Sequence, residues 1–233
     1  MQADGQINEL ILLDGLPAAR ILCPPRLIPA PGQYLLAHAD GSDSPPALRS
    51  SVLAAPVFAA KIFASGFLAA PPAPSSWIPG MRLHLRGPLG HGFSLPASAR
   101  RVALIAFDQS PRRLLSLLDP AFKQDASVTL VCDHQPDGLP LQVEVQPLRA
   151  LNEVCVWADY AAFDSARESL PGLRERLGML SPLDGRSAAQ ILVRAPMPCG
   201  GLAECGVCAV EGRRAHLLAC EDGPVFDLKD LLK

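Results

Sequence analysis

The chain has 233 residues, of which 49% are hydrophobic, and its formal net charge is −2 at pH 7. This length and hydrophobic content support one large domain, or two modest domains with a small appendage. The nearly balanced charge argues against nucleic acid or an acidic membrane surface as a partner.

The N-terminal segment lacks the features of a targeting sequence. Residues 1–9 carry acidic side chains and no basic stretch ahead of the short apolar run at 10–13, so no signal peptide is predicted. No apolar run approaches the roughly 20 residues that a membrane helix needs. We therefore expect a cytoplasmic protein. In a reducing compartment, clustered cysteines more often bind a metal than form disulfides.

The first hundred residues consist of short extended runs separated by prolines and glycines. Residues 82–86 alternate polar and apolar side chains, which is typical of a half-buried strand. Regular short strands with such breaks predict an antiparallel sandwich or barrel. The predicted strands are 9–13, 19–23, 33–38, 51–59, 61–67 and 81–86.

From Arg101 onward, apolar strands alternate with helical stretches. This alternation indicates a parallel sheet with crossover connections. The last helical stretch is interrupted by Pro171 and Gly172, so two short helices are expected there. The predicted strands are 102–106, 127–132 and 154–158, and the predicted helices lie within 111–118 and 163–180.

Four of the seven cysteines gather near the C-terminus. Four thiolates can hold an iron–sulfur cluster, and nearby glycines allow a tight loop whose backbone N–H groups face the sulfurs. Residues 209–216 are predicted to form a hairpin that leads back to the last cysteine. The segment from 188 is too short to bury a core of its own, so a metal would supply much of its stability. The clustered cysteines are Cys199, Cys205, Cys208 and Cys220.

Two other interpretations of these four cysteines remain open. A tetrahedral four-cysteine site is also a common structural solution for zinc, and the four could instead be buried free thiols. The remaining three cysteines, Cys23, Cys132 and Cys155, occur singly and are expected to behave as small buried hydrophobes.

Three segments carry a family resemblance. The cysteine segment from Cys199 through Cys220, with the following residues 221–226, resembles the iron–sulfur end of the electron-transfer subunit of bacterial dihydroorotate dehydrogenase. Residues 31–34 (Pro-Gly-Gln-Tyr) and 87–93 (Gly-Pro-Leu-Gly-His-Gly-Phe) are similar to two further motifs of that family. Those subunits belong to the ferredoxin-reductase superfamily, and the matches span nearly the whole chain in order.

The resemblance implies a multi-domain α+β protein. It implies a flavin-reductase-like antiparallel β-barrel in 1–97, an α/β domain of degenerate nucleotide-binding type in 98–187, and a small [2Fe-2S] domain in 188–233. It assigns the four clustered cysteines as ligands of a [2Fe-2S] cluster. The implied partner is a flavoprotein oxidoreductase, such as a dihydroorotate dehydrogenase-type catalytic subunit. We thus expect an accessory electron-transfer subunit rather than a complete enzyme, and no catalytic residue is assigned.

The chain departs from the family pattern at the nicotinamide site. The family has a glycine-rich phosphate loop after the first parallel strand, whereas this chain has no glycine between Gly92 and Gly138. Asp108 adds negative charge where phosphates would lie. We therefore expect no nicotinamide binding of the family type. Arg112 and Arg113 could still meet an anion, but the expected arrangement is that both are solvated in a first helical turn.

The remaining departures concern the cysteine spacing and the flavin. Five residues separate Cys199 from Cys205, whereas plant-type spacing has four. The nearest match to the family's Arg-Pro-x-Ser/Thr flavin motif is 48–52, which lacks the proline. The resemblance implies FAD, and the rings at hand are Tyr34, Phe63 and Phe67. A non-redox interaction subunit with structural zinc or a structural cluster is the alternative function. A complete flavin- and nicotinamide-dependent reductase is a third.

Overall fold

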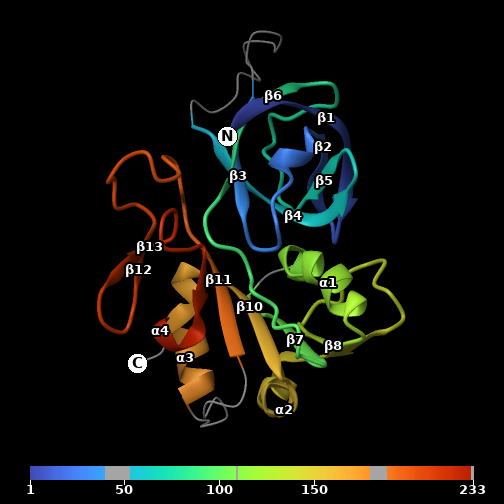
Figure 1. Ribbon diagram of the computed structural model, residues 1–233, viewed down its shortest axis with the longest axis vertical. Helices are drawn as coiled ribbons and strands as arrows, with labels where there is room; N and C mark the ends of the chain where they lie inside the picture. Colours follow the sequence, from blue (N-terminus) through green and yellow to red (C-terminus); the bar gives the residue numbers. More distant parts are fainter. Residues whose placement is uncertain (40–52, 109, 179–187, 232–233) are drawn as a thin grey trace.

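The computed structural model describes residues 1–39, 53–108, 110–178 and 188–231. It contains a closed six-stranded barrel, a six-stranded sheet flanked by helices, and a two-stranded hairpin (Figure 1). The predicted fold class is confirmed: an antiparallel barrel comes first, a mainly parallel α/β sheet follows, and a small C-terminal region bears the clustered cysteines.

The barrel closes in the order β1-β2-β5-β4-β3-β6, with every neighbouring pair antiparallel. Its interior is filled by alternating apolar side chains such as Ile7, Leu35 and Phe67, all fully buried. Its strands are β1 (Gln2–Leu13), β2 (Leu16–Leu22), β3 (Tyr34–Ala39), β4 (Ala55–Phe63), β5 (Gly66–Ala69) and β6 (Arg82–Leu89), and a 3-10 turn, η1 (Pro25–Leu27), follows β2.

One predicted barrel strand is wrong. Residues 61–67 contain the end of β4, a tight turn and the start of β5, because Phe63 pairs with Gly66. The apolar run hides this turn, since only Gly66, with φ +151°, marks it. The predicted strand 51–59 begins outside the described residues and overlaps β4 at its end.

The central sheet has the order β14-β11-β10-β7-β8-β9, parallel except at β14. Figure 1 shows α3 and α4 on one side of it, near the hairpin. Its strands are β7 (Arg101–Ala106), β8 (Ser127–Val131), β9 (Val143–Gln146), β10 (Tyr160–Ala166), β11 (Ala188–Arg194) and β14 (Val225–Asp227). The helices are α1 (Leu118–Lys123), α2 (Leu151–Trp157), α3 (Leu170–Gly178) and α4 (Leu228–Leu231). The 3-10 turns are η4 (Pro111–Arg113), η5 (Leu115–Leu117), η6 (Leu148–Ala150) and η7 (Arg167–Ser169).

Three predictions in this region are wrong. Residues 154–158 lie mostly in α2 rather than in a strand, because a short apolar run does not separate a strand from a buried helix. The described part of the predicted 163–180 stretch, residues 163–178, contains the end of β10, the turn η7 and the single helix α3. Pro171 lies in the first turn of α3, where its missing N–H costs no bond. Residues 111–118 form two 3-10 turns, and α1 begins only at Leu118.

The cysteine segment runs between two strands of the central sheet. It leaves β11, forms the predicted hairpin of β12 (Ala209–Glu211) and β13 (His216–Leu218), and returns through β14. Cys208 and Val210 share one hydrophobic core with Ile191 and Phe226, so the segment packs on the α/β sheet. Among the described residues, no helix is long and apolar enough to cross a membrane.

Candidate metal centre

The loop from Cys199 to Cys208 turns on three glycines. Gly200, Gly201 and Gly206 have φ values of +53°, +81° and +67°, a region that disfavours side chains with a Cβ. The loop places Cys205 at the surface and Cys208 in the interior. The glycines thus allow a tight loop that begins at the half-buried Cys199, exposes Cys205 and ends at the buried Cys208.

The four cysteine sulfurs meet as two pairs. The Sγ atoms of Cys199 and Cys205 lie 3.5 Å apart on the exposed side, and those of Cys208 and Cys220 lie 3.2 Å apart in the interior. In the described part of the chain, no three His, Cys, Asp or Glu side chains form one group that could hold a metal ion. A single zinc ion needs all its sulfurs about 2.3 Å from one point, whereas a two-iron cluster takes two protein ligands on each iron. The pairing is compatible with a two-iron donor set.

One thiol of each pair has a shifted pKa, and the two shifts have opposite signs. Hydrogen bonding with the backbone, first at Ala203, lowers the pKa of Cys199 to about 7. Burial, reinforced by the neighbouring Cys208 thiol, raises the pKa of Cys220 to about 12. A bound metal deprotonates a thiol outright, so Cys220 would release its proton on metal binding. Burial raises the pKa of Cys155 to about 12, in keeping with its predicted role as a small hydrophobe.

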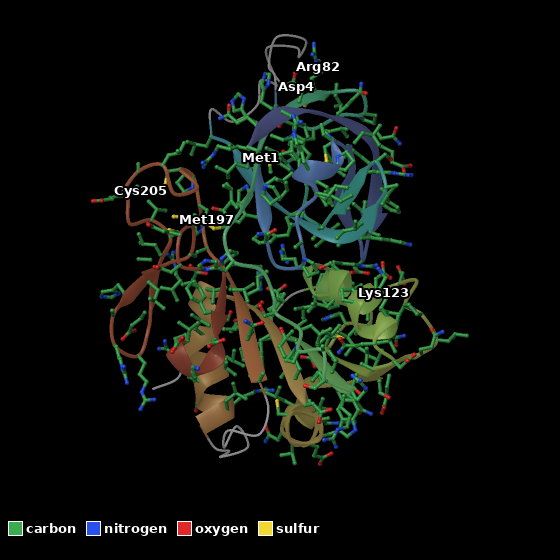
Figure 2. All side chains as sticks on the ribbon, viewed as in Figure 1. Met1, Asp4, Arg82, Lys123, Met197 and Cys205 are labelled. Carbon is green, nitrogen blue, oxygen red and sulfur yellow. The ribbon has the colours of Figure 1, made fainter. Side chains whose placement is uncertain are left out.

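Two barrel side chains reach the cysteine segment, one at each sulfur pair. Arg86 Nη2 donates to the carbonyl oxygens of Cys199, at 2.8 Å, and Gly200, at 2.6 Å. Tyr34 Oη donates to the carbonyl oxygen of Cys220 at 3.4 Å. Figure 2 shows the loop that bears Met197 and Cys205 beside the barrel. Sequence reasoning missed Arg86, since its partners lie more than a hundred residues along the chain.

The upstream motifs of the family resemblance meet next to this segment. The backbone N–H of Phe93 donates to the Pro31 carbonyl at 2.8 Å, and that of His91 donates to the Gly223 carbonyl at 2.6 Å. At Gly90, with φ +71°, an added Cβ would lie 2.5 Å from the Gly223 carbonyl oxygen. The three segments therefore form one junction between the barrel and the cysteine-bearing region.

The carboxyl ends of the parallel strands form a second candidate site, the edge where open α/β folds bind nucleotides. Here two acids and two arginines, Asp108, Asp164, Arg113 and Arg194, form an ionic network. Arg194 Nε donates to Asp164 Oδ1 at 2.7 Å, and its Nη2 pairs with Asp108. Arg113 Nη1 lies 3.5 Å from Asp164 Oδ2, and its Nη2 donates to the Pro71 carbonyl of the barrel at 2.9 Å.

The prediction that Arg112 and Arg113 are solvated is wrong, because each is only 8% exposed. The 3-10 turn at Pro111–Arg113 directs both side chains into the barrel junction. Arg112 donates to both carboxylate oxygens of Asp14, at 2.9 and 2.6 Å. This contact holds the pKa of Asp14 below its usual range.

Burial dominates the electrostatics of the ionic network. It raises the pKa of Asp164 to about 6, against the opposing effect of Arg113, and lowers the pKa of Arg194 to about 10. The network brings two acidic and two basic side chains together, and each of the four contacts at least one partner of opposite type. In the described part of this edge no glycine turn follows β7, and Arg113 and Arg194 are paired with carboxylates, so the family's glycine-rich phosphate loop has no counterpart here.

A cavity of about 430 Å³ lies between the barrel and this network. Its barrel wall includes Phe58 and Trp77, while two of the rings named for flavin stacking, Tyr34 and Phe67, are fully buried. Among the described residues that line it, the cations are Arg113 and Arg194, both paired with carboxylates in the ionic network. The sequence match at 48–52 lies outside the described residues.

Comparison with known proteins shows the fold. No protein-family model matches the chain, and neither does any curated protein sequence. A structure of an NADH-dependent reduced ferredoxin–NADP oxidoreductase has a TM-score of 0.73 at 13% identity, with 98% of this chain and 90% of that chain covered. The ferredoxin reductase of carbazole 1,9a-dioxygenase has a TM-score of 0.61 at 15% identity, covering 83% and 69%. The FAD/NAD-binding domain of a Vibrio cholerae nitric oxide dioxygenase has a TM-score of 0.55 at 12% identity, covering 82% and 98%.

Proposed function

We propose that this chain, which has a ferredoxin-reductase-like fold, is an iron–sulfur electron-transfer subunit. Cys199 with Cys205, and Cys208 with Cys220, would each hold one iron of a [2Fe-2S] cluster. The observation that carries the proposal is the arrangement of the four sulfurs as two pairs at 3.5 and 3.2 Å. A bound cluster supplies one-electron transfer.

The loop around the outer pair suits electron exchange with another protein. Leu202 and Val207 on either side of Cys205 are 75% and 45% exposed, so apolar surface surrounds this ligand. The partner we propose is a flavoprotein oxidoreductase, such as a dihydroorotate dehydrogenase-type catalytic subunit, in line with the sequence resemblance. Because the ionic network occupies the nucleotide edge, the electron donor or acceptor lies on that partner.

Cofactor content tests the proposal directly. The protein is purified without oxygen after growth with ample iron, and iron, sulfide, zinc and flavin are measured together. We expect about two irons and two sulfides per chain, with no stoichiometric zinc. A Cys155→Ser variant serves as the matched control, because it removes a buried thiol outside the cluster. A colourless protein with one zinc per chain contradicts the proposal.

A non-redox interaction subunit is the second candidate. The burial of Cys208 and Cys220 in the core shared with the α/β sheet favours it, since a structural zinc or cluster stabilises a short segment of this kind. Reductive titration separates the two candidates: an electron-transfer subunit takes up electrons reversibly, whereas a structural zinc takes up none.

A further inference from the structure

The loop between Cys199 and Cys205 is one residue longer than the plant-type spacing. Directly after Cys199, two successive left-handed glycines form a bulge, with φ values of +53° at Gly200 and +81° at Gly201. Within the loop, the Leu202 N–H donates to the Cys199 carbonyl at 3.2 Å, while the two glycines add little rigidity of their own. A contact from outside the loop can therefore fix the bulge further.

Arg86 on β6 of the barrel makes that contact. One nitrogen, Nη2, donates to two successive carbonyl groups, those of Cys199 at 2.8 Å and Gly200 at 2.6 Å. The fit is tight, because a Cβ at Gly200 would meet the guanidinium group and would lie 2.5 Å from Cδ1 of Leu36. Leu36 on β3 pairs with Arg86 on β6 in the barrel sheet, so two hydrogen-bonded strands position the side chains that contact Gly200.

The positive charge of Arg86 faces the cysteine loop without a carboxylate beside it. Within the described residues, Arg86 forms no salt bridge, and both of its hydrogen bonds go to loop carbonyl groups. Reduction of a cluster adds one negative charge, and a nearby cation stabilises the more negative state. The same side chain can therefore fix the loop and favour reduction.

We propose that Arg86 is the positioning residue of the cysteine loop, holding the bulge at Cys199 and Gly200 and shifting the redox equilibrium of the cluster toward its reduced form. This inference rests on the proposed function for its redox part only. The positioning part concerns the loop itself and is testable in metal-free protein.

The test compares Arg86→Met, which removes both the charge and the donors, with Arg86→Lys, which keeps the charge. Arg82→Met is the matched control, because Arg82 lies on the same strand and, within the described part of the chain, forms its ion pair with Asp4 at the surface. Figure 2 shows Arg82 and Asp4 at the end of the barrel away from the loop that bears Cys205. The readouts are amide hydrogen exchange of residues 199–205 in metal-free protein and the redox equilibrium of the reconstituted cluster.

In Arg86→Met, we expect amide exchange in the loop to accelerate about tenfold, and the ratio of reduced to oxidised cluster at a fixed potential to fall about threefold to tenfold. A tenfold change corresponds to about 59 mV for one electron. Arg86→Lys should keep most of the redox ratio, and Arg82→Met should match the wild type in both readouts.

The outcomes separate the two proposals. If the wild type takes up no cluster, the proposed function fails, and amide exchange still decides whether Arg86 clamps the loop. If Arg86→Met exchanges at the wild-type rate, the positioning role is overturned. If the cluster forms and its redox ratio is equal in Arg86→Met and Arg82→Met, the electrostatic role is overturned.

Discussion

The cysteine loop and the edge of the parallel sheet are two candidate cofactor sites on one fold, and they use polar groups in opposite ways. At the loop, Arg86 donates to backbone carbonyl groups, and the four thiols contact one another in two pairs. At the edge, Asp164, Arg194 and Asp108 bond to one another. The cysteine loop thus keeps its four thiols next to one another, whereas the charged side chains at the sheet edge are paired among themselves.

This difference teaches that the fold alone does not fix which cofactors a chain carries. A ferredoxin-reductase-like frame supplies a barrel junction and a sheet edge. Which of them works depends on a few residues at each, such as Gly200 at the loop and Asp108 at the edge. The predictions below act on one region and leave the other unchanged.

The largest effect is expected from Cys208→Ser. It removes one of the proposed ligands from the buried sulfur pair, so bound iron should be lost completely, while the ionic network stays intact. Iron and sulfide analysis after anaerobic reconstitution measures this. Cys155→Ser is the matched control, since Cys155 is equally buried, and it should keep full iron content. Equal iron in both variants would refute the assignment of Cys208 as a ligand.

Asp164→Asn disrupts the ionic network at the edge of the parallel sheet. It leaves Arg113 and Arg194 without their shared carboxylate in the interior, and we expect a loss of about 3–5 kcal/mol in the free energy of unfolding. Urea denaturation measures the loss. Glu175→Gln on the exposed face of α3 is the control and should stay within about 0.5 kcal/mol of the wild type. If Asp164→Asn leaves the free energy of unfolding unchanged, the network contributes nothing to stability.

Gly200→Ala tests the tightness of the cysteine loop. The substitution combines a left-handed backbone with a clash against Leu36 and Arg86, and should cost about 2–4 kcal/mol. Gly206→Ala has φ +67° but open space around its Cβ position, so it should cost only about 1–2 kcal/mol. Thermal unfolding of both variants, with iron retention under chelator, gives the comparison. A reversed order would show that contact with the barrel does not matter.

The smallest effect concerns the Asp14–Arg112 pair, which ties the barrel to the α/β domain. The pKa of Asp14 is lowered in the folded state by Arg112, so its contribution is present above about pH 4 and is lost as the pH falls through the folded pKa. Asp14→Asn should lower the free energy of unfolding by about 1–2 kcal/mol at pH 7, and it should reduce the loss of stability between neutral and acidic pH. If Asp14→Asn loses as much stability at acidic pH as the wild type does, that loss comes from other carboxylates.

The sequence was sufficient to predict the elements that have a local signal. Alternating residues such as those at 82–86 predicted a barrel strand, and the run 102–106 predicted a buried parallel strand. The run at 154–158 failed because its helical periodicity, with Val156 67% exposed and Cys155 buried, shows only over a longer stretch. Local sequence patterns therefore predicted the architecture, but they missed short elements whose hydrophobic periodicity fits both a strand and a helix.

At the sites, the sequence predicted the ligand candidates and missed the residues that hold them. The spacing of glycines and cysteines predicted the loop because these residues lie close together in the sequence. Arg86 lies 113 residues before Cys199, and Arg112 lies 98 residues after Asp14, so neither contact has a local signal. Such long-range pairing is decided by packing, which a single sequence does not display.

Reductive titration of the anaerobically reconstituted protein, followed by electron paramagnetic resonance, tests the central claim most directly. The account predicts uptake of about one electron per chain, with a paramagnetic signal that appears on reduction and is absent from Cys208→Ser. A protein that holds stoichiometric zinc, or that takes up no electron across the accessible range of potential, contradicts it.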